Sequence, residues 1–122
     1  PWPAASMVQA CDKAFSLASQ KLECITLAAS TAWNSTAMVV ACDTELTLAS
    51  GKLECIDWAS DPQWSAAAMV VACGDAFSLS SDVLECVEYA SGSPRDSANI
   101  VSDCDKAHSL ASQKLTCIQN AT

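Results

Sequence analysis

The chain has 122 residues, of which 51% are hydrophobic, and a formal net charge of −8, with 3 glycines, 4 prolines and 8 cysteines. These values predict one folded domain over residues 1–122, with helix favoured over strand because glycine and proline are scarce. The acidic charge argues against nucleic acid and anionic membranes as partners. Membrane insertion is not expected either, because no apolar run approaches ~20 residues.

The cysteines define a repeat. Their spacing alternates between 13 and 18 residues, at Cys11, Cys24, Cys42, Cys55, Cys73, Cys86, Cys104 and Cys117. The chain therefore consists of four 31-residue repeats, at about 1–29, 30–60, 61–91 and 92–122. Such a period is typical of stacked supersecondary units. Pro1-Trp2-Pro3 opens straight onto the first repeat, as expected of a mature or trimmed chain.

Each repeat begins with residues that favour a helix start. In the second repeat Asn34 is the expected N-cap, and Trp33 before it is expected to pack on Met38 as a hydrophobic staple. The corresponding residues are Trp2 and Met7 in the first repeat, Trp64, Ser65 and Met69 in the third, and Arg95, Asp96 and Ile100 in the fourth. The loops between repeats are therefore expected near 29–34, 60–65 and 91–96.

Two apolar helical segments follow each start, with a joint rich in serine and threonine between them. In the second repeat the segments run from Met38 to Ala49 and from Leu53 to Ala59. The joints are Ser16–Ser19, Thr47–Ser50, Ser78–Ser81 and Ser109–Ser112. The serine that ends each joint is a suitable N-cap for a second helix. Each repeat is therefore predicted to be an αα-hairpin.

One unbroken helix of about 25 residues per repeat is the alternative, because the apolar arc keeps its phase from Met38 through Ala59. Four such helices would form an up-and-down four-helix bundle. Helices in a bundle alternate in direction, so near-identical repeats would face different neighbours. Stacked hairpins give every repeat the same surroundings, which favours the hairpins.

The outer repeats also differ from the inner ones as the open ends of a stack require. Gln9 and Ser102 replace the Val40 and Val71 of the inner repeats. The last repeat further carries Asp103, His108 and Asn120 at positions that are mostly apolar elsewhere. The predicted fold is therefore all-α, a short α-solenoid of four disulfide-stapled hairpins.

An even number of cysteines at fixed repeat positions predicts disulfides and an oxidising compartment, hence a secreted, extracellular or periplasmic protein. Hairpins require the pairs Cys11–Cys24, Cys42–Cys55, Cys73–Cys86 and Cys104–Cys117. The bundle requires Cys24–Cys42, Cys55–Cys73, Cys86–Cys104 and Cys11–Cys117. Metal binding by the thiols is the alternative, but zinc sites usually need closer cysteines or histidine partners, and the chain has one histidine.

No residue pattern predicts catalysis. His108 lacks an evident nucleophile and orienting group, and is expected to be a polar replacement in a capping repeat. Acidic residues next to the cysteines recur once per repeat, as a solvated helix face would: Asp12, Asp43, Asp105, Glu23, Glu54 and Glu85. Calcium-loop and phosphate-loop spacings are absent. The protein is therefore predicted not to be an enzyme and to need no cofactor.

Trp58 and Tyr89 are the candidate partner-binding residues. They share one repeat position, lie on the polar arc and have acidic neighbours, and aromatic residues dominate binding hot spots. Packing under the next inter-repeat loop is the structural alternative. Asn34 and Asn120 begin N-glycosylation sequons, which matter only in a eukaryotic source.

The expected function is that of a non-catalytic binding module for a protein or glycan, because stacked repeats present an extended surface and reactive groups are lacking. A durable structural protein, in a matrix or on ice, is the second hypothesis. Thiol-based metal binding is the third.

Overall fold

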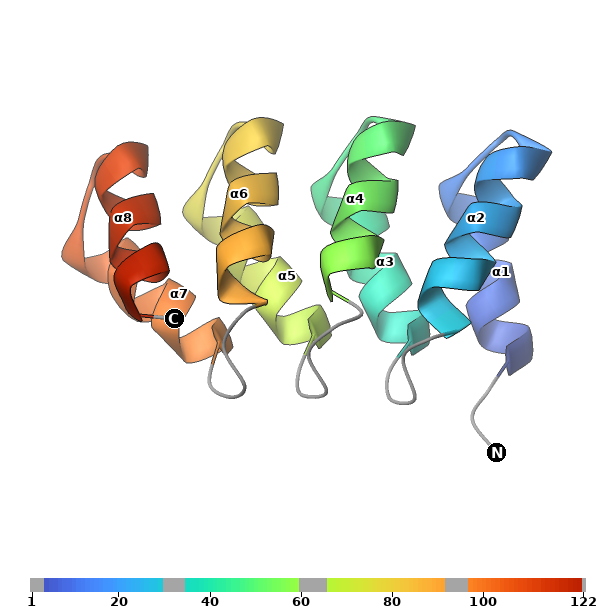
Figure 1. Ribbon diagram of the computed structural model, residues 1–122, viewed down its shortest axis with the longest axis horizontal. Helices are drawn as coiled ribbons and strands as arrows, with labels where there is room; N and C mark the ends of the chain where they lie inside the picture. Colours follow the sequence, from blue (N-terminus) through green and yellow to red (C-terminus); the bar gives the residue numbers. More distant parts are fainter. Residues whose placement is uncertain (1–3, 30–34, 60–65, 92–96, 122) are drawn as a thin grey trace.

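A computed structural model describes residues 4–29, 35–59, 66–91 and 97–121, and these residues form eight helices without a strand. The helices are α1 (Ala4–Ala14), α2 (Ala18–Ala29), α3 (Ser35–Glu45), α4 (Ala49–Ala59), α5 (Ala66–Ala76), α6 (Ser80–Ala90), α7 (Ser97–Ala107) and α8 (Ala111–Ala121). Each repeat supplies two helices, which pack as a hairpin, and the four hairpins stand side by side (Figure 1).

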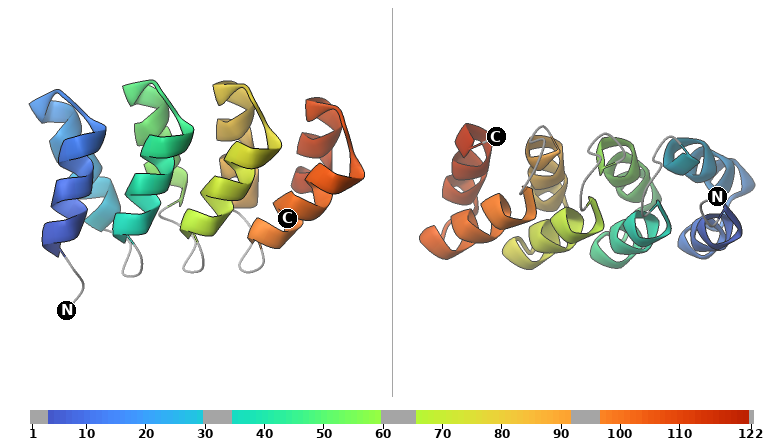
Figure 2. Two further views of the ribbon diagram at one scale, coloured as in Figure 1. Left: turned by 180° about the vertical axis from the view of Figure 1, so that it is seen from behind. Right: turned by 90° about the horizontal axis from the view of Figure 1, so that it is seen from below.

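The helices form two layers. The first helices of the repeats, α1, α3, α5 and α7, pack on one another in one layer, and α2, α4, α6 and α8 do so in the other (Figure 2). The two chain ends lie at opposite ends of the stack (Figure 1). The predicted short α-solenoid of stapled αα-hairpins is therefore confirmed. The four-helix bundle is not formed, since every helix in the described ranges has 11 or 12 residues.

A disulfide joins the two helices of each hairpin. The bridges are Cys11–Cys24, Cys42–Cys55, Cys73–Cys86 and Cys104–Cys117, with Cα–Cα distances of 5.7 or 5.8 Å. This distance is the common one for disulfides. Each bridge closes a loop of about 14 residues, which stabilises the fold by roughly 3 kcal/mol through the unfolded chain.

The joints are shorter than predicted, and the serines do not cap the second helices. The carbonyls of Leu17, Leu48, Leu79 and Leu110 accept the first helical hydrogen bonds, at 2.9–3.0 Å, from the residues four positions on. A leucine is therefore the N-cap residue, and at α6 Leu79 has an extended backbone without a side-chain cap. The serine prediction was wrong because tertiary packing and the disulfide, rather than capping propensity, decide where these short helices begin.

The predicted staples are described only in part. Met7, Met38 and Met69 are buried in the core, and Ile100 is half-buried. Their predicted partners and the predicted N-caps lie outside the described residues: Trp2, Trp33, Asn34, Trp64, Ser65, Arg95 and Asp96.

Two lysines connect neighbouring repeats. The Lys52 ammonium pairs with Asp43 of its own repeat at 2.7 Å and donates to the carbonyl of Ala14, the last residue of α1, at 3.0 Å. Lys114 repeats this arrangement with Asp105 at 2.7 Å and Ala76, the last residue of α5, at 2.8 Å. A cation at a helix C-terminus is favourable, since the carbonyls there carry partial negative charge.

Each of these lysines also lies over an aromatic ring of the preceding repeat. The distances from ammonium to ring centroid are 5.9 Å for Lys52 and Phe15, and 5.6 Å for Lys114 and Phe77. Both are within the range of a cation–π attraction. Each of these lysines therefore links the two helices of its own hairpin and also contacts a helix end and an aromatic ring of the preceding repeat.

The third repeat makes a different contact with the second. Gly74 and Val83 occupy the Asp and Lys positions. Glu45 ends the preceding first helix and Leu46 follows it, in place of Ala and Phe. A Cβ on Gly74 would collide with the side chain of Glu45, which fills that space. The buried Val83 replaces the lysine. All four positions change together, so the stack contains two types of repeat–repeat contact.

Replacing Lys52 with methionine tests the lysine contact. Lys52→Met is expected to lower the free energy of unfolding by about 1–2 kcal/mol, because a charged hydrogen bond and a helix-end interaction are both lost. Lys21→Met is the matched control: Lys21 has its Asp12 partner at 2.7 Å, but α1 is the first helix described, and an exposed pair contributes at most about 1 kcal/mol. Urea unfolding followed by circular dichroism measures both. Equal losses in the two variants would contradict this role for Lys52.

Candidate binding surface on the first helices of the repeats

The outer face of the first-helix layer contains a groove of about 640 Å³ across α3, α5 and α7. Small and apolar residues make up most of its lining, with alanines such as Ala37, Ala68 and Ala98 at one end. This layer faces the viewer in the left view of Figure 2. Because alanine side chains are short, the backbone of a ligand can come close to the helices there.

Val40 and Val71 line this groove with their side chains exposed to solvent. Their exposure corrects the interpretation of Gln9 and Ser102 as polar caps on the ends of the stack. This repeat position lies on the outer arc of the first helix, so its residue faces solvent in inner and outer repeats alike. The change from glutamine or serine to valine therefore makes the α3 and α5 parts of the groove apolar, whereas Ser102 leaves its α7 side polar.

Two carboxylates lie at the other end of the groove. Glu45 is the last residue of α3, and Asp75 is in the last turn of α5. The outer repeats instead carry Lys13 and Lys106 in the last turns of α1 and α7, where the helix dipole favours a cation. The two central repeats thus place negative charge where the helix ends disfavour it.

The electrostatics of this pair are unfavourable in the isolated protein. Burial, and then the charge of Asp75, raise the pKa of Glu45 above its ordinary value. Among the described residues, no basic side chain lies within ion-pair distance of either carboxylate. Residues that break a local rule in this way often mark a functional site.

The predicted partner-binding residues lie elsewhere. Trp58 on α4 and Tyr89 on α6 are half-buried and pack against the core from the second layer of helices. Neither residue lines the groove. The structure therefore does not bring them together with Val40, Val71 and the carboxylates, and their role in binding remains a prediction.

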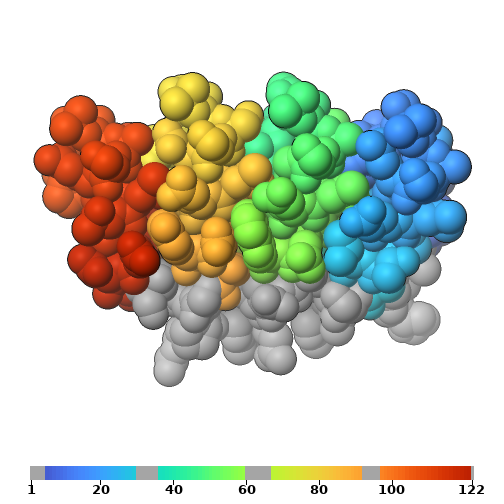
Figure 3. Space-filling view, turned by 45° about the horizontal axis from the view of Figure 1, so that its top comes forward, coloured from blue at the N-terminus to red at the C-terminus, as the bar shows by residue number. Residues whose placement is uncertain are grey.

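A row of exposed leucines that the sequence analysis does not identify lies in the joints of the hairpins. Leu17, Leu48, Leu79 and Leu110 are each more than half exposed, and they occupy the same position in every repeat. They lie at the hairpin tips, which form separate lobes along the upper edge of Figure 3. The available signal was the same large apolar residue in all four repeats, among small and polar residues of the joint.

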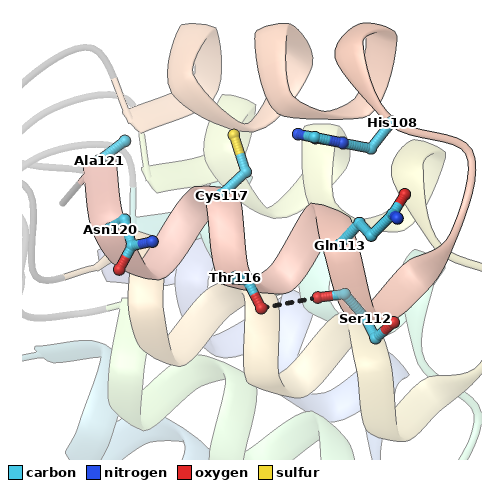
Figure 4. A pocket seen from close by; sticks show the side chains of 7 residues that line it. All are labelled: His108, Ser112, Gln113, Thr116, Cys117, Asn120 and Ala121. Carbon is cyan, nitrogen blue, oxygen red and sulfur yellow. Dashed lines mark hydrogen bonds between the residues drawn. The ribbon is translucent and has the colours of Figure 1, made fainter.

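The residues considered for chemistry have other surroundings. His108 lines a hollow on the outer side of α8 with Cys117, Ser112 and Asn120, and Cys117 is bridged (Figure 4). Three of the acidic residues form ion pairs between the two helices of a hairpin, in addition to facing solvent as expected: Asp12 with Lys21, Asp43 with Lys52 and Asp105 with Lys114. Glu23, Glu54 and Glu85 are exposed. Within the described ranges, no three His, Cys, Asp or Glu residues are placed to hold a metal ion.

Comparisons with protein-family models, curated proteins and solved structures found no match to this chain. No helix in the described part of the chain is long and apolar enough to cross a membrane. The function has to be inferred from the groove and its charges.

The raised pKa of Glu45 predicts a pH-dependent effect of Glu45→Gln. The charged carboxylate is disfavoured in the folded state, so it lowers stability above its folded pKa, and this penalty disappears as pH falls below the ordinary value of 4.5. Glu45→Gln should therefore raise the free energy of unfolding at pH 7 and give no gain at a pH well below 4.5. The exposed Glu54→Gln is the control. A gain of the same size at both pH values would rule out this electrostatic origin.

Proposed function

We propose that the protein is a non-catalytic binding module that takes a polypeptide segment in the groove across α3, α5 and α7. The observation that carries the proposal is the combination of an exposed apolar strip, formed by Val40 and Val71, with two carboxylates that have no cationic partner in the described structure. The segment's apolar side chains would cover the valines, and a lysine or arginine would reach the carboxylates.

Charge complementarity supports a basic group on the partner. A cation near Glu45 and Asp75 would relieve their mutual repulsion and would also interact favourably with the C-terminal ends of α3 and α5. Each of these effects is weak in water and stronger in a groove from which a ligand excludes water. The acids therefore supply specificity, while the apolar strip supplies contact area.

A polypeptide fits the groove better than a glycan does. The described residues that line the groove include no aromatic ring on which a sugar could stack, and those in its central part are valine and alanine. A polypeptide segment with both apolar and basic side chains offers groups for the valines and for the carboxylates. Its narrow backbone fits against helices lined with alanine. Nucleic acid is a poor candidate because the chain's net charge is −8.

The proposed location is outside the cytoplasm, in an extracellular or periplasmic space. The support is the four disulfides, which persist in oxidising compartments. Thiol-based metal binding is not supported, since none of the described cysteines is free. A purely structural role would suit the stapled hairpins equally, but it gives no reason for carboxylates at the helix ends of the central repeats.

Peptide binding tests the proposal. An array of short peptides that combine valine or leucine with one lysine should capture the protein, whereas the same peptides with glutamate in place of lysine should not. Added salt should weaken capture, because part of the affinity is electrostatic. Failure of the array to distinguish lysine from glutamate would contradict the proposed role of the carboxylates.

Variants locate the binding surface. The double change Val40→Asp and Val71→Asp should reduce the affinity for the best peptide at least tenfold, while Gln9→Asp, at the same repeat position on α1, should not. Replacing Trp58 and Tyr89 with serine should leave affinity unchanged if the fold is retained, as circular dichroism would show. Loss of capture in that variant alone would move the site to the second layer and refute the groove.

A further inference from the structure

The outer side of the first repeat exposes residues that the other repeats bury. We call this side, which includes Val8, Asp12, Lys21 and Leu22, the front face. Val8 is 42% exposed, whereas Val39, Val70 and Val101 at the same repeat position are fully buried. Leu22 is 65% exposed, whereas its equivalents Leu53, Leu84 and Leu115 are half-buried. The front face is therefore an inter-repeat surface without a described neighbour.

The inner repeats show what such a face packs against. In the second and fourth repeats, the Asp–Lys pair of the front face meets a first helix that ends in alanine followed by phenylalanine. In the third repeat, Gly74 lies against the side chain of Glu45 instead, and Val83 and Leu46 occupy the positions of the lysine and the phenylalanine. Each front face is thus matched to one kind of helix end on the preceding repeat. The first repeat, with Asp12 and Lys21 paired at 2.7 Å, has a front face of the Asp–Lys kind.

The last repeat offers the matching helix end. Its first helix ends in Ala107, followed by His108, so a small residue and a planar ring stand where Ala14 and Phe15 stand in the first repeat. A glutamate at the alanine position, as in Glu45, would occupy the space of the aspartate. The outer side of the fourth repeat is therefore of the kind that accepts an Asp–Lys front face.

A hollow of about 610 Å³ lies on this outer side, which we call the back face, and it is lined by His108, Ser112, Gln113, Thr116, Cys117 and Asn120 (Figure 4). Leu84 of the third repeat is the equivalent of Leu22, and Gly51 of the second repeat is the equivalent of Gln113. These two positions lie close together, since a Cβ on Gly51 would be 3.7 Å from Leu84 Cδ1. The leucine of a front face would accordingly enter the hollow beside Gln113.

The charges of the back face are consistent with packing. Thr116 occupies a position that is glutamate in the other three repeats, and its hydroxyl donates to the carbonyl of Ser112 at 2.9 Å. None of the described residues that line the hollow carries a carboxylate. The missing charge lowers the repulsion that another acidic molecule would meet there.

We infer that the front face of one copy packs into the back face of a second copy, so that the protein associates head to tail. A heterologous contact that extends the stack in one direction, instead of rotating copies into a ring, produces open chains of copies. His108 and Asn120 are more polar than their apolar equivalents in the other repeats, so the contact is weaker than those inside the stack and depends on concentration. Assembly would continue the layer of first helices from one copy to the next.

Sedimentation velocity of the full chain, from micromolar to millimolar concentration, tests this inference. The mean mass should rise steadily above 12.7 kDa without levelling at a dimer. Leu22→Glu blocks the front face and Asn120→Lys blocks the back face, and each variant alone should remain monomeric. The control is Leu17→Glu, because Leu17 is an exposed leucine at a hairpin tip, and this variant should associate like the unchanged chain.

Mixing the two blocked variants gives the decisive result. Each retains the face that the other has lost, so an equimolar mixture should form a one-to-one dimer and nothing larger. A monomer at every concentration would overturn the inference, as would association that Leu17→Glu abolishes or that either blocked variant retains. Those last two results would point to a contact through the hairpin tips or to a symmetric dimer. Circular dichroism checks that each variant is folded.

Discussion

The disulfide across each hairpin is the constraint on which the structure depends. Two helices of 11 or 12 residues are too short to be stable alone, and one hairpin has little apolar surface to bury. A bridge between the two helices fixes their facing sides at Cα–Cα distances of 5.7–5.8 Å. The hairpin then behaves as a preformed unit that only needs neighbours on two sides, and four such units stacked in a row form the protein.

Stacking in turn creates the surfaces that matter for function. Because each first helix packs on the next, their outer arcs form one continuous layer, in which the residues of the central repeats can differ from those at the flanks. Glu45, which stands where the other repeats have alanine, has two roles. Its side chain fills the space next to Gly74, and its carboxylate lies near Asp75 in the groove. Packing between the second and third repeats and the charge of the groove are therefore coupled.

The hairpins could be predicted from the sequence because the cysteine period and the Ser/Thr-rich joints are local patterns. The leucine N-caps could not, since packing of neighbouring hairpins, rather than the propensity of Ser19 or Ser50, determines where the second helices begin. The exposure of Val40 could not be predicted, because helical periodicity separates polar from apolar arcs but does not show which solvent-facing arc lies on a groove. The contact between Glu45 and Gly74 joins different repeats, so it required the register of the stack.

Mapping the disulfides of the unreduced protein is the most direct test of the stacked-hairpin fold. Trypsin cuts the denatured chain after Lys13, Lys21, Lys52, Arg95, Lys106 and Lys114. The stacked hairpins predict one species that joins peptides 1–13, 22–52 and 53–95, and a separate species that joins 96–106 to 115–122. A free peptide 22–52 with an internal bridge, together with 1–13 linked to 115–122, would show a closed bundle and contradict the fold.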